Sequence, residues 1–374
     1  MIDDIAEAVL ARDDIARYLQ GSRGESGVAA RERIHGYLEE LRTTQRYSIY
    51  RALKHPLYPI LRKIERRGEQ VEHAVAATRA GRVIYASNHR SHTDYLIEPL
   101  VLDDGGVRPP IIAAGINLFG GPLGLLHRHV TGAIPIRRNT RDPAYLMTLK
   151  AYVAELLRKH DLFFYPEGGR SYSGEMKAPK TGLMLAALQA GQPRMVILPT
   201  AVSYDLVLED RVLARQRVKR VQRPFSRELA EMVRYAVGYR SRAFVTFGAP
   251  MVVDGIDTES RREVLEFTHQ VMATVGRLVK VLPTGVIAHA MGPSITRGDL
   301  AQRADAILDT LRAAGANLGV TSGAEALDQG IEPLEARGII VSERGRLRVR
   351  DRNVLRYYAH TLDHLLASPS RRTH

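Results

Sequence analysis

Short apolar runs alternate with longer segments of helical periodicity through the middle of the chain. The runs of strand length fall at residues 82–87, 110–114, 132–136, 161–165, 195–202 and 243–248. The segments with apolar positions at helical spacing fall at residues 93–101, 119–128, 142–159 and 181–190. Strands that alternate with helices are typical of an α/β domain with helices packed on its sheet. We therefore predict a mixed sheet flanked by helices over residues 79–255.

The two ends of the chain show helical patterns without this alternation. Residues 1–78 are predicted to be helical, and residues 256–374 mostly helical, with a helix followed by a hairpin at 334–349, as in a winged helix. In the first region, the segment Leu57–Arg67 has apolar residues at helical spacing among basic ones, which predicts a basic amphipathic helix. This helix either packs on the domain with a solvated basic face or meets anionic lipid, where each basic residue adds about 1 kcal/mol.

Composition narrows the class of protein. The chain has 374 residues, 54 Lys and Arg against 41 Asp and Glu, a net charge of +13 and 45% hydrophobic residues, which together favour a basic globular protein. It has no cysteine, which excludes disulfides and thiol chemistry. Its apolar runs stay below the roughly 18 to 20 residues of a membrane-spanning helix, and no signal-sequence pattern opens it. We therefore expect a cytoplasmic protein whose membrane contact is peripheral.

Residues 88–95, Asn-His-Arg-Ser-His-Thr-Asp-Tyr, follow the predicted strand at 82–87 and carry the first candidate chemistry. His89 and Asp94 can form a general-base dyad, in which the carboxylate accepts the proton of one ring nitrogen and leaves the other free to deprotonate a hydroxyl. His89 and His92 could instead bind zinc, but the chain lacks cysteine and shows no typical ligand spacing elsewhere, so we predict no metal. Asp94 could also be an ordinary residue of a helix N-terminus.

Basic residues and glycines gather after two later strands. Arg137 and Arg138 end the run at 132–136, where guanidinium groups suit a phosphate. A glycine-rich loop follows the run at 161–165, and backbone N–H groups and basic side chains in such a loop bind oxyanions. Its candidate residues are Glu167, Gly168, Gly169, Arg170, Ser171 and Lys180. Because successive strand side chains point to opposite faces, we expect one of the adjacent arginines to face away from the site, and we rank Arg138 as the less certain of the two.

In this order and at these spacings, the segments resemble the conserved blocks of the glycerol-3-phosphate and dihydroxyacetone-phosphate acyltransferase family. The matching segments are His89–Asp94 for H-x-x-x-x-D, Gly132–Arg138 for G-x-x-F-I-R-R, Glu167–Gly174 with Pro179–Gly182 for the glycine-rich block, and the strand that leads from Pro199 to Tyr204. The form HRSHxDY is typical of the glycerol-3-phosphate branch. Pro135 stands where the family usually has phenylalanine, which leaves both arginines in place but changes the local packing.

The resemblance implies an acyltransferase-type fold and a glycerol-3-phosphate O-acyltransferase, which transfers a fatty acyl group from acyl-CoA or acyl carrier protein to the sn-1 hydroxyl. It implies His89 as the base and Asp94 as its orienting carboxylate. The implied phosphate-binding candidates are Arg137, Arg138, Arg170 and Lys180, and the residues that shape the loop are Glu167, Gly168, Gly169 and Ser171. No cofactor is expected beyond the thioester co-substrate. The lipid product implies peripheral association with an anionic membrane surface, the inner face of the cell membrane.

Several alternatives stay open at this point. Dihydroxyacetone phosphate and 1-acylglycerol 3-phosphate offer the same hydroxyl and phosphate as acceptors, and a basic surface suits either acidic donor, coenzyme A or acyl carrier protein. A non-enzyme alternative is a nucleic-acid-binding protein, which the basic composition and the hairpin at 334–349 favour. That alternative leaves the dyad and the glycine-rich loop unexplained, and the chain has no tryptophan, so we expect no nucleic-acid partner.

Overall fold

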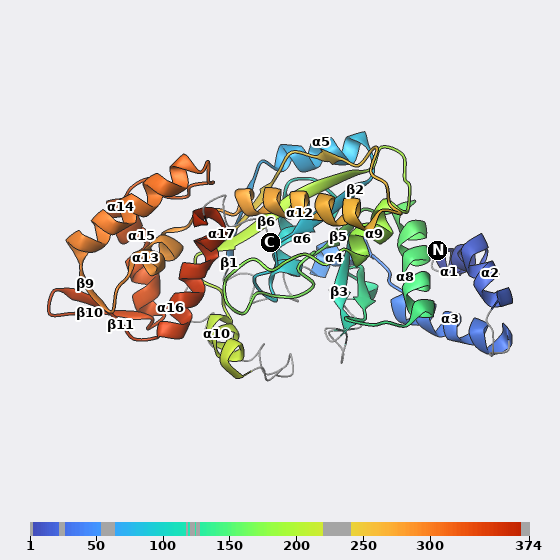
Figure 1. The fold of residues 1–374 in the computed structure, drawn as a ribbon, viewed down its shortest axis with the longest axis horizontal. Helices are drawn as coiled ribbons and strands as arrows, with labels where there is room; N and C mark the ends of the chain where they lie inside the picture. The colour runs from blue at the N-terminus through green and yellow to red at the C-terminus, as the bar shows by residue number, and fades with distance from the viewer. Residues whose placement is uncertain are drawn as a thin grey trace.

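A computed structural model describes residues 3–21, 27–53, 64–116, 119, 124, 128–219 and 241–367 (Figure 1). The predicted helix at 119–128 and the first part of the predicted amphipathic segment, up to residue 63, lie largely outside these residues. Within the described chain, every helix is too short or too polar to cross a membrane.

One mixed sheet of eight strands forms the centre of the described chain. The strands are β1 (Ile64–Glu69), β2 (Val83–Ser87), β3 (Ile111–Gly115), β4 (Ala133–Ile136), β5 (Leu162–Phe164), β6 (Val196–Tyr204), β7 (Ser241–Phe247) and β8 (Met251–Val252). Their order is β1-β7-β6-β2-β5-β3-β4, with β8 paired to β6. β6 runs antiparallel to β7 and β8, and the other pairs are parallel. The predicted mixed α/β sheet is confirmed.

Helices cover both faces of this sheet, which explains why its strands read as apolar runs rather than as alternating patterns. Ile84 in β2 belongs to one core together with Leu162, and the covering helices there include α8 (Pro143–Leu157), α9 (Gly182–Leu188) and α12 (Arg261–Leu278). The next residue, Tyr85, belongs to the other core and stacks on Phe163, with ring centroids 5.8 Å apart. Further covering helices are α5 (Val71–Ala80) and α6 (Asp94–Asp104).

Four helices form the N-terminal region of the described chain, and the first three of them lie at one end of the sheet, beside α8 (Figure 1). They are α1 (Asp3–Leu10), α2 (Asp13–Gly21), α3 (Gly27–Leu41) and α4 (Tyr47–Leu53). The first three of them pack directly against α8, which carries one wall of the site described below. The predicted helical character of this region is therefore found over residues 3–53, except for the residues outside the described chain.

The prediction of a helix that continues to Arg67 is wrong. Residues from Ile64 onward form β1, which pairs in parallel with β7 over its whole length. Ile64 is buried, whereas Arg67 is exposed on this edge strand. The backbone hydrogen bonds that β7 supplies outweigh the local helical spacing, and periodicity does not report such a long-range contact. The sheet therefore begins before residue 79, the boundary predicted for the catalytic domain.

The C-terminal module, residues 283–366, forms a lobe at the other end of the sheet (Figure 1). Its elements are α13 (Pro283–Ala290), β9 (Ser294–Thr296), α14 (Arg297–Ala313), α15 (Gly323–Ala336), β10 (Ile340–Glu343), β11 (Arg346–Val349), α16 (Arg352–Ala359), η3 (His360–Leu362) and α17 (Asp363–Leu366). The three strands form an antiparallel sheet in the order β10-β11-β9. Gly338 and Gly345 adopt φ angles of 68° and 74° where α15 ends and the hairpin turns. The predicted helix and hairpin are confirmed.

Candidate active site

The loop after β2 brings His89 and Asp94 together. His89 Nδ1 lies 2.9 Å from Asp94 Oδ2, and Asp94 is buried as the first residue of α6. The same carboxylate oxygen accepts the backbone N–H groups of Arg90 at 2.6 Å and Ser91 at 2.9 Å. These bonds fix the carboxylate at a helix N-terminus, where negative charge is stabilised. The structure therefore contains the predicted contact between imidazole and carboxylate, and Asp94 is a helix N-terminal residue as well.

The electrostatic surroundings favour an uncharged imidazole. Burial lowers the pKa of His89 well below its ordinary value, and nearby arginine and lysine side chains lower it further. Burial raises the pKa of Asp94 to about 6, against the opposing hydrogen bonds from Ser91 and Tyr204. Asp94 is thus ionised at neutral pH and accepts the Nδ1 proton of His89. The other ring nitrogen, Nε2, is left without a proton, as a general base requires.

Two residues that the sequence did not suggest, Tyr165 and Glu98, complete the surroundings of the dyad. The ring of Tyr165 stacks on the His89 imidazole, with centroids 4.1 Å apart and planes inclined by 13°. The Tyr165 hydroxyl donates to Glu98 Oε2 at 2.7 Å. Burial and the charge of Asp94 raise the pKa of Glu98 well above its ordinary range. Glu98 follows Asp94 by four residues on α6, so helical spacing was the signal that could have placed it at the site.

The two adjacent arginines after β4 point in different directions. Arg137 donates from Nε to Glu40 Oε1 at 2.7 Å, and its guanidinium lies between two tyrosine rings. Arg138 faces the glycine-rich loop instead, with Nη1 3.5 Å from the place where a Cβ on Gly169 would stand. The Arg137 guanidinium thus contacts Glu40 and the two rings rather than the glycine-rich loop. Both arginines are among the residues that line the cavity described below, so the ranking that placed Arg138 second stays a prediction. The carboxylate of Glu40, which binds Arg137, favours the reverse order.

Pro135 stands in the last strand of the described sheet. β4 lies at the end of the strand order, where β3 is its partner and Pro135 is opposite Ala114. Proline lacks an N–H donor and is tolerated in such edge strands. The departure from the family's phenylalanine therefore leaves β4 intact, and Ile136 and Arg138 still line the cavity described below.

The glycine-rich loop is tied to the dyad by two of the predicted residues. Glu167 is buried and accepts the backbone N–H groups of His89 at 3.0 Å and Lys177 at 2.9 Å. Ser171 donates its hydroxyl to the Glu175 carbonyl at 2.6 Å and its backbone N–H to the His89 carbonyl at 3.0 Å. Glu167 and Ser171 thus connect the loop to the segment after β2 by hydrogen bonds.

Lys180 and Arg138 are two cations beside this loop, and a third, Lys177, donates from Nζ to the Gly169 carbonyl oxygen at 2.8 Å. Gly168 has a φ of 67°, and a Cβ there would stand 2.8 Å from Cδ of Lys180. Lys180 is exposed, and its Nζ donates to the neutral Oδ1 of Asn139 at 2.9 Å. Among the described residues, no carboxylate forms an ion pair with Lys180 or with Arg138. Both side chains are therefore placed to bind an anion beside the loop.

Arg170 does not join these two cations. Its buried side chain has Nη1 3.4 Å from Glu209 Oε1, and it is absent from the described residues that line the cavity. A guanidinium that already faces a buried carboxylate is poorly placed to bind a phosphate, because that carboxylate would be left without its cation. Arg170 acts on the dyad electrostatically, because its positive charge is one of those that lower the pKa of His89. The phosphate-binding role predicted for Arg170 thus lacks geometric support.

A cavity of about 760 Å³ opens beside the dyad. At its polar end lie His89, Arg138 and Lys180, together with both glycines of the loop. The remaining wall is largely apolar and includes Ala113, Ile136, Leu146, Met147, Leu149, Phe164, Leu183 and Ala186. An apolar cavity with a few convergent polar groups is typical of a ligand site. Its two ends together fit a ligand with an anionic head and a long apolar chain.

One group of side chains outside the dyad has the composition of a metal site. Glu175 follows the glycine-rich loop, and His360 and Asp363 belong to the C-terminal module, with their ligand-type atoms within 4.8 Å of one another. His360 Nδ1 and Glu175 Oε1 are 3.3 Å apart, a contact between partly exposed side chains of a kind that is common without a metal ion. We therefore assign no metal to this group.

Comparisons with known proteins bear on this site. Residues 63–203 match the family model described as acyltransferase, a range that contains the dyad, Arg138 and the glycine-rich loop. A glycerol-3-phosphate acyltransferase from Actinobacillus succinogenes is 36% identical over 234 residues, which cover 60% of this chain and 28% of the relative. A protein of the same name from Aeromonas hydrophila is 30% identical over 380 residues, which cover 91% of this chain and 47% of the relative.

The curated relatives are longer than this chain, which spans less than half of the length of each of these two. A putative acyltransferase from Mycobacterium bovis is 27% identical over 303 residues, which cover 75% of this chain and 47% of the relative. The crystal structure of the 1-acyl-sn-glycerophosphate acyltransferase from Thermotoga maritima is similar over 72% of this chain, with a TM-score of 0.37 and 15% identity. That similarity is too low to support a further statement.

Proposed function

We propose an activity for this chain from the premise that residues 63–203 are an acyltransferase-family domain, which confirms the predicted resemblance. The proposed reaction is the transfer of a fatty acyl group from an acyl thioester to the sn-1 hydroxyl of glycerol 3-phosphate. Its products are 1-acylglycerol 3-phosphate and the free thiol. The observation that carries the proposal is the buried, uncharged His89 beside Asp94, at the polar end of a cavity with an apolar wall.

His89 is the proposed base and then the proposed acid of this transfer. Its Nε2 takes the proton of the acceptor hydroxyl as the hydroxyl oxygen attacks the carbonyl carbon of the thioester, and Asp94 stabilises the imidazolium that forms. Collapse of the tetrahedral intermediate breaks the carbon–sulfur bond, and the departing thiolate takes the proton from His89. No covalent acyl-enzyme is required. The Ser91 hydroxyl beside the dyad donates to Glu209 at 2.9 Å, which supports a structural role for it.

Arg138 and Lys180 are the proposed ligands of the acceptor's phosphate. Both line the polar end of the cavity together with His89. A guanidinium gives forked hydrogen bonds to phosphate oxygens, and an ammonium adds a second positive charge. The backbone of Gly168 and Gly169 lies between them at the same end of the cavity. This arrangement supports a phosphate held within reach of the base.

Replacing Arg138 with alanine should raise the KM for glycerol 3-phosphate by about 10- to 100-fold, the effect of losing hydrogen bonds to a charged group. The KM for the acyl donor should change by less than about threefold, because the apolar wall does not involve this side chain. Steady-state kinetics with each substrate varied in turn measure both values. Arg138→Lys should restore only part of the loss, because a point charge lacks the fork of the guanidinium.

The matched control is Arg137→Ala, one residue earlier. This change breaks the ion pair with Glu40 and should lower the Tm. Arg137 also lines the cavity, but its guanidinium already binds Glu40, so the KM for glycerol 3-phosphate should rise less than in Arg138→Ala. Equal effects of Arg138→Ala on the KM of both substrates would contradict the assignment. So would a larger acceptor effect from Arg137→Ala than from Arg138→Ala.

The acyl chain of the donor is proposed to lie along the apolar wall formed by α8 and α9. The thioester is acyl-CoA or acyl–acyl carrier protein. The deciding experiment offers this chain both donors, with a radiolabelled acyl group, and three acceptors: glycerol 3-phosphate, dihydroxyacetone phosphate and 1-acylglycerol 3-phosphate. We expect 1-acylglycerol 3-phosphate as the main product. Preference for another acceptor would replace the proposed substrate, and no transfer to any acceptor would remove the proposed function.

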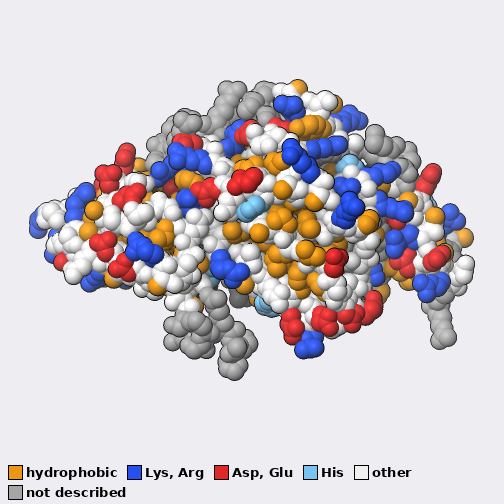
Figure 2. Space-filling view, turned by 90° about the horizontal axis from the view of Figure 1, so that it is seen from above, with side chains coloured by type: hydrophobic (Ala, Val, Ile, Leu, Met, Phe, Trp, Pro, Cys, Tyr) orange, Lys and Arg blue, Asp and Glu red, His pale blue; other side chains and the backbone are white. Residues whose placement is uncertain are grey.

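Peripheral contact with an anionic membrane surface, at the inner face of the cell membrane, is part of the proposal because the product is a lipid. Figure 2 shows a face of the molecule on which hydrophobic side chains gather at the centre, with Lys and Arg groups, and also Asp and Glu groups, around them. Such a mixture suits shallow contact with anionic headgroups. The segment proposed as a main contributor, Tyr50–Arg67, lies partly outside the described residues.

Neutralising the basic residues of this segment should weaken binding to vesicles that contain anionic lipid, because each contributes about 1 kcal/mol near the surface. The residues to be neutralised together are Lys54, Arg62, Lys63, Arg66 and Arg67. Binding of the parent protein should also fall as salt rises. The control neutralises five exposed arginines of the C-terminal module, namely Arg297, Arg303, Arg312, Arg344 and Arg348. Unchanged co-sedimentation of the first variant with vesicles would show that this segment is not the docking surface.

The structure adds one observation on the nucleic-acid alternative. In winged-helix proteins the helix in the position of α15 enters a groove of DNA. The charged residues within α15 are Glu325, Asp328, Glu332 and Glu335. Four carboxylates on this helix would repel phosphates, so the C-terminal module favours the enzyme over a duplex-binding protein.

A further inference from the structure

Two consecutive buried carboxylates, Glu209 and Asp210, lie between the C-terminal module and the two catalytic loops. These loops are the segment 88–95 after β2 and the glycine-rich loop after β5. Their exposed fractions are 1% and 0%. They follow β6 and open α10 (Asp210–Lys219), beyond the range that matches the acyltransferase family model. A carboxylate is buried at high cost unless cations and hydrogen-bond donors compensate it. The groups that compensate Glu209 come from the catalytic loops, and those that compensate Asp210 come from the C-terminal module.

Glu209 holds the segment between the two members of the dyad. It accepts the backbone N–H of His92 at 2.6 Å and the Ser91 hydroxyl at 2.9 and 3.0 Å. It also faces Arg170 of the glycine-rich loop, with 3.4 Å between Nη1 and Oε1. Ser91 and His92 stand between His89 and Asp94 in the chain. One carboxylate therefore joins the dyad segment to the loop that carries Glu167 and Ser171.

Asp210 holds the C-terminal module. Arg337, directly after α15, donates to Asp210 Oδ1 from Nη2 at 2.6 Å and from Nε at 3.1 Å. Tyr358 of α16 donates to the other oxygen at 2.8 Å. Arg337 is itself buried and also donates to the Leu208 carbonyl at 2.7 Å. The peptide that presents Glu209 to the dyad is therefore fixed by the C-terminal module.

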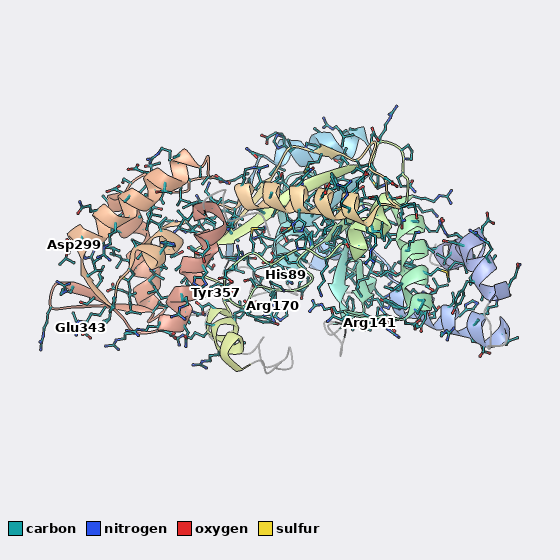
Figure 3. All side chains as sticks on the ribbon, in the orientation of Figure 1. His89, Arg141, Arg170, Asp299, Glu343 and Tyr357 are labelled. Carbon is teal, nitrogen blue, oxygen red and sulfur yellow. The ribbon has the colours of Figure 1, made fainter. Side chains whose placement is uncertain are left out.

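The C-terminal module also packs directly against the catalytic loops. His89, Arg170 and Tyr357 lie together where α16 meets the sheet, whereas Asp299 and Glu343 lie at the far end of the C-terminal module (Figure 3). The carbonyl oxygen of Tyr357 would stand 1.9 Å from a Cβ placed on Gly174, so the end of the glycine-rich loop packs directly on α16. The C-terminal module thus supports both loops of the site.

We infer that Glu209 is a positioning residue of the acyl transfer and that the C-terminal module holds it in place through Asp210. The inference rests on the proposed function, because it assigns Glu209 a part in that reaction. Neither carboxylate is among the described residues that line the cavity, so neither touches substrate. Glu209 acts through the segment that joins His89 to Asp94 and through Arg170, whose charge it opposes. A displacement of about 1 Å at the reacting groups can cost on the order of 100-fold in rate.

The first test is Glu209→Gln, which keeps the shape and one acceptor oxygen but removes the charge. We expect kcat to fall by about 10- to 100-fold, with the KM for glycerol 3-phosphate changed less than about threefold. Arg170 would then act on His89 without the opposing charge of Glu209 and would disfavour protonation of His89 further, so the acid limb of kcat/KM should move to lower pH. Hydrogen–deuterium exchange should become faster at the backbone amides of residues 89–94.

The second test acts from the side of the C-terminal module. Arg337→Lys keeps a cation opposite Asp210 but loses the two-nitrogen contact. We expect a smaller fall in kcat, and faster exchange at residues 89–94, although the substitution lies outside the catalytic loops. This variant also serves if Glu209→Gln does not fold. The matched control is Asp205→Asn, a buried carboxylate paired with Arg242 at 2.9 Å; its carboxylate contacts β7 and the chain after β6. It should lower the Tm and leave kcat, the acid limb and the exchange at 89–94 unchanged.

The outcomes separate this inference from the proposed function. If the parent protein transfers acyl groups and the Glu209, Arg337 and Asp205 variants all lower the Tm with normal kcat and pH profile, Glu209 is structural only and the inference is overturned. If the parent transfers no acyl group, the proposed function fails. The exchange at residues 89–94 is then still informative: faster exchange in Glu209→Gln supports the link to the C-terminal module, and unchanged exchange removes it.

Discussion

Replacing His89 with alanine should lower kcat by about 10²- to 10⁴-fold while the protein remains folded. Among the described residues that line the cavity, the His89 imidazole combines an orienting carboxylate with an uncharged state. Its loss removes the acceptor of the hydroxyl proton in the transition state, so the effect should fall on kcat rather than on either KM. Turnover at saturating substrates and a thermal unfolding curve measure the two halves of this expectation.

His73→Ala is the control for the loss of a structural imidazole. His73 Nδ1 lies 2.9 Å from the carbonyl oxygen of Phe247, so its removal should cost stability without changing kcat. The pH profile of the parent enzyme supplies a second check. Because the pKa of His89 lies well below its ordinary value of 6.5, the imidazole stays uncharged at pH values somewhat below 6.5. The acid limb of kcat/KM should therefore lie below that pH. Near-normal turnover of His89→Ala, or equal losses in both alanine variants, would remove the dyad from the mechanism.

The features that the sequence predicted are those that short stretches of chain determine. His89 and Asp94 are placed by one turn between the buried strand β2 and the start of α6, and each contact that fixes the Asp94 carboxylate to the turn lies within five residues. Apolar runs gave the strands of the sheet because both of its faces are covered. Local pattern and tertiary structure agree at these positions.

The features that were missed depend on partners far along the chain. Arg137 turns away from the loop because Glu40, 97 residues earlier, binds it. Arg170 is withdrawn from the cavity by Glu209, 39 residues later. β1 forms because β7 pairs with it, although the local spacing indicated a helix. Each of these arrangements has the same cause: a charge or a backbone edge is compensated by a residue that no local pattern could identify.

Replacing Asp94 with asparagine should also lower kcat, by about 10²-fold or more, although the side chain keeps its size. The amide has no charge, so the imidazolium that forms in the transition state loses its buried counter-ion. If the amide turns its NH₂ group toward His89, the ring is held in the wrong tautomer and Nε2 carries the proton. Both arrangements impair proton removal. The loss of the anion should also move the acid limb of kcat/KM to lower pH, because imidazolium becomes less stable.

The control for a helix-start effect is Asp142→Asn. Asp142 caps α8 by accepting the backbone N–H of Ala144 at 2.9 Å, and it lies outside the dyad. Asparagine caps a helix about as well as aspartate, so kcat and the pH profile should stay unchanged there. Asp94 combines such a position with the contact to His89, and only the second function should be lost in Asp94→Asn. A fully active Asp94→Asn would leave Asp94 as a helix N-terminal residue alone and would require another group to orient His89.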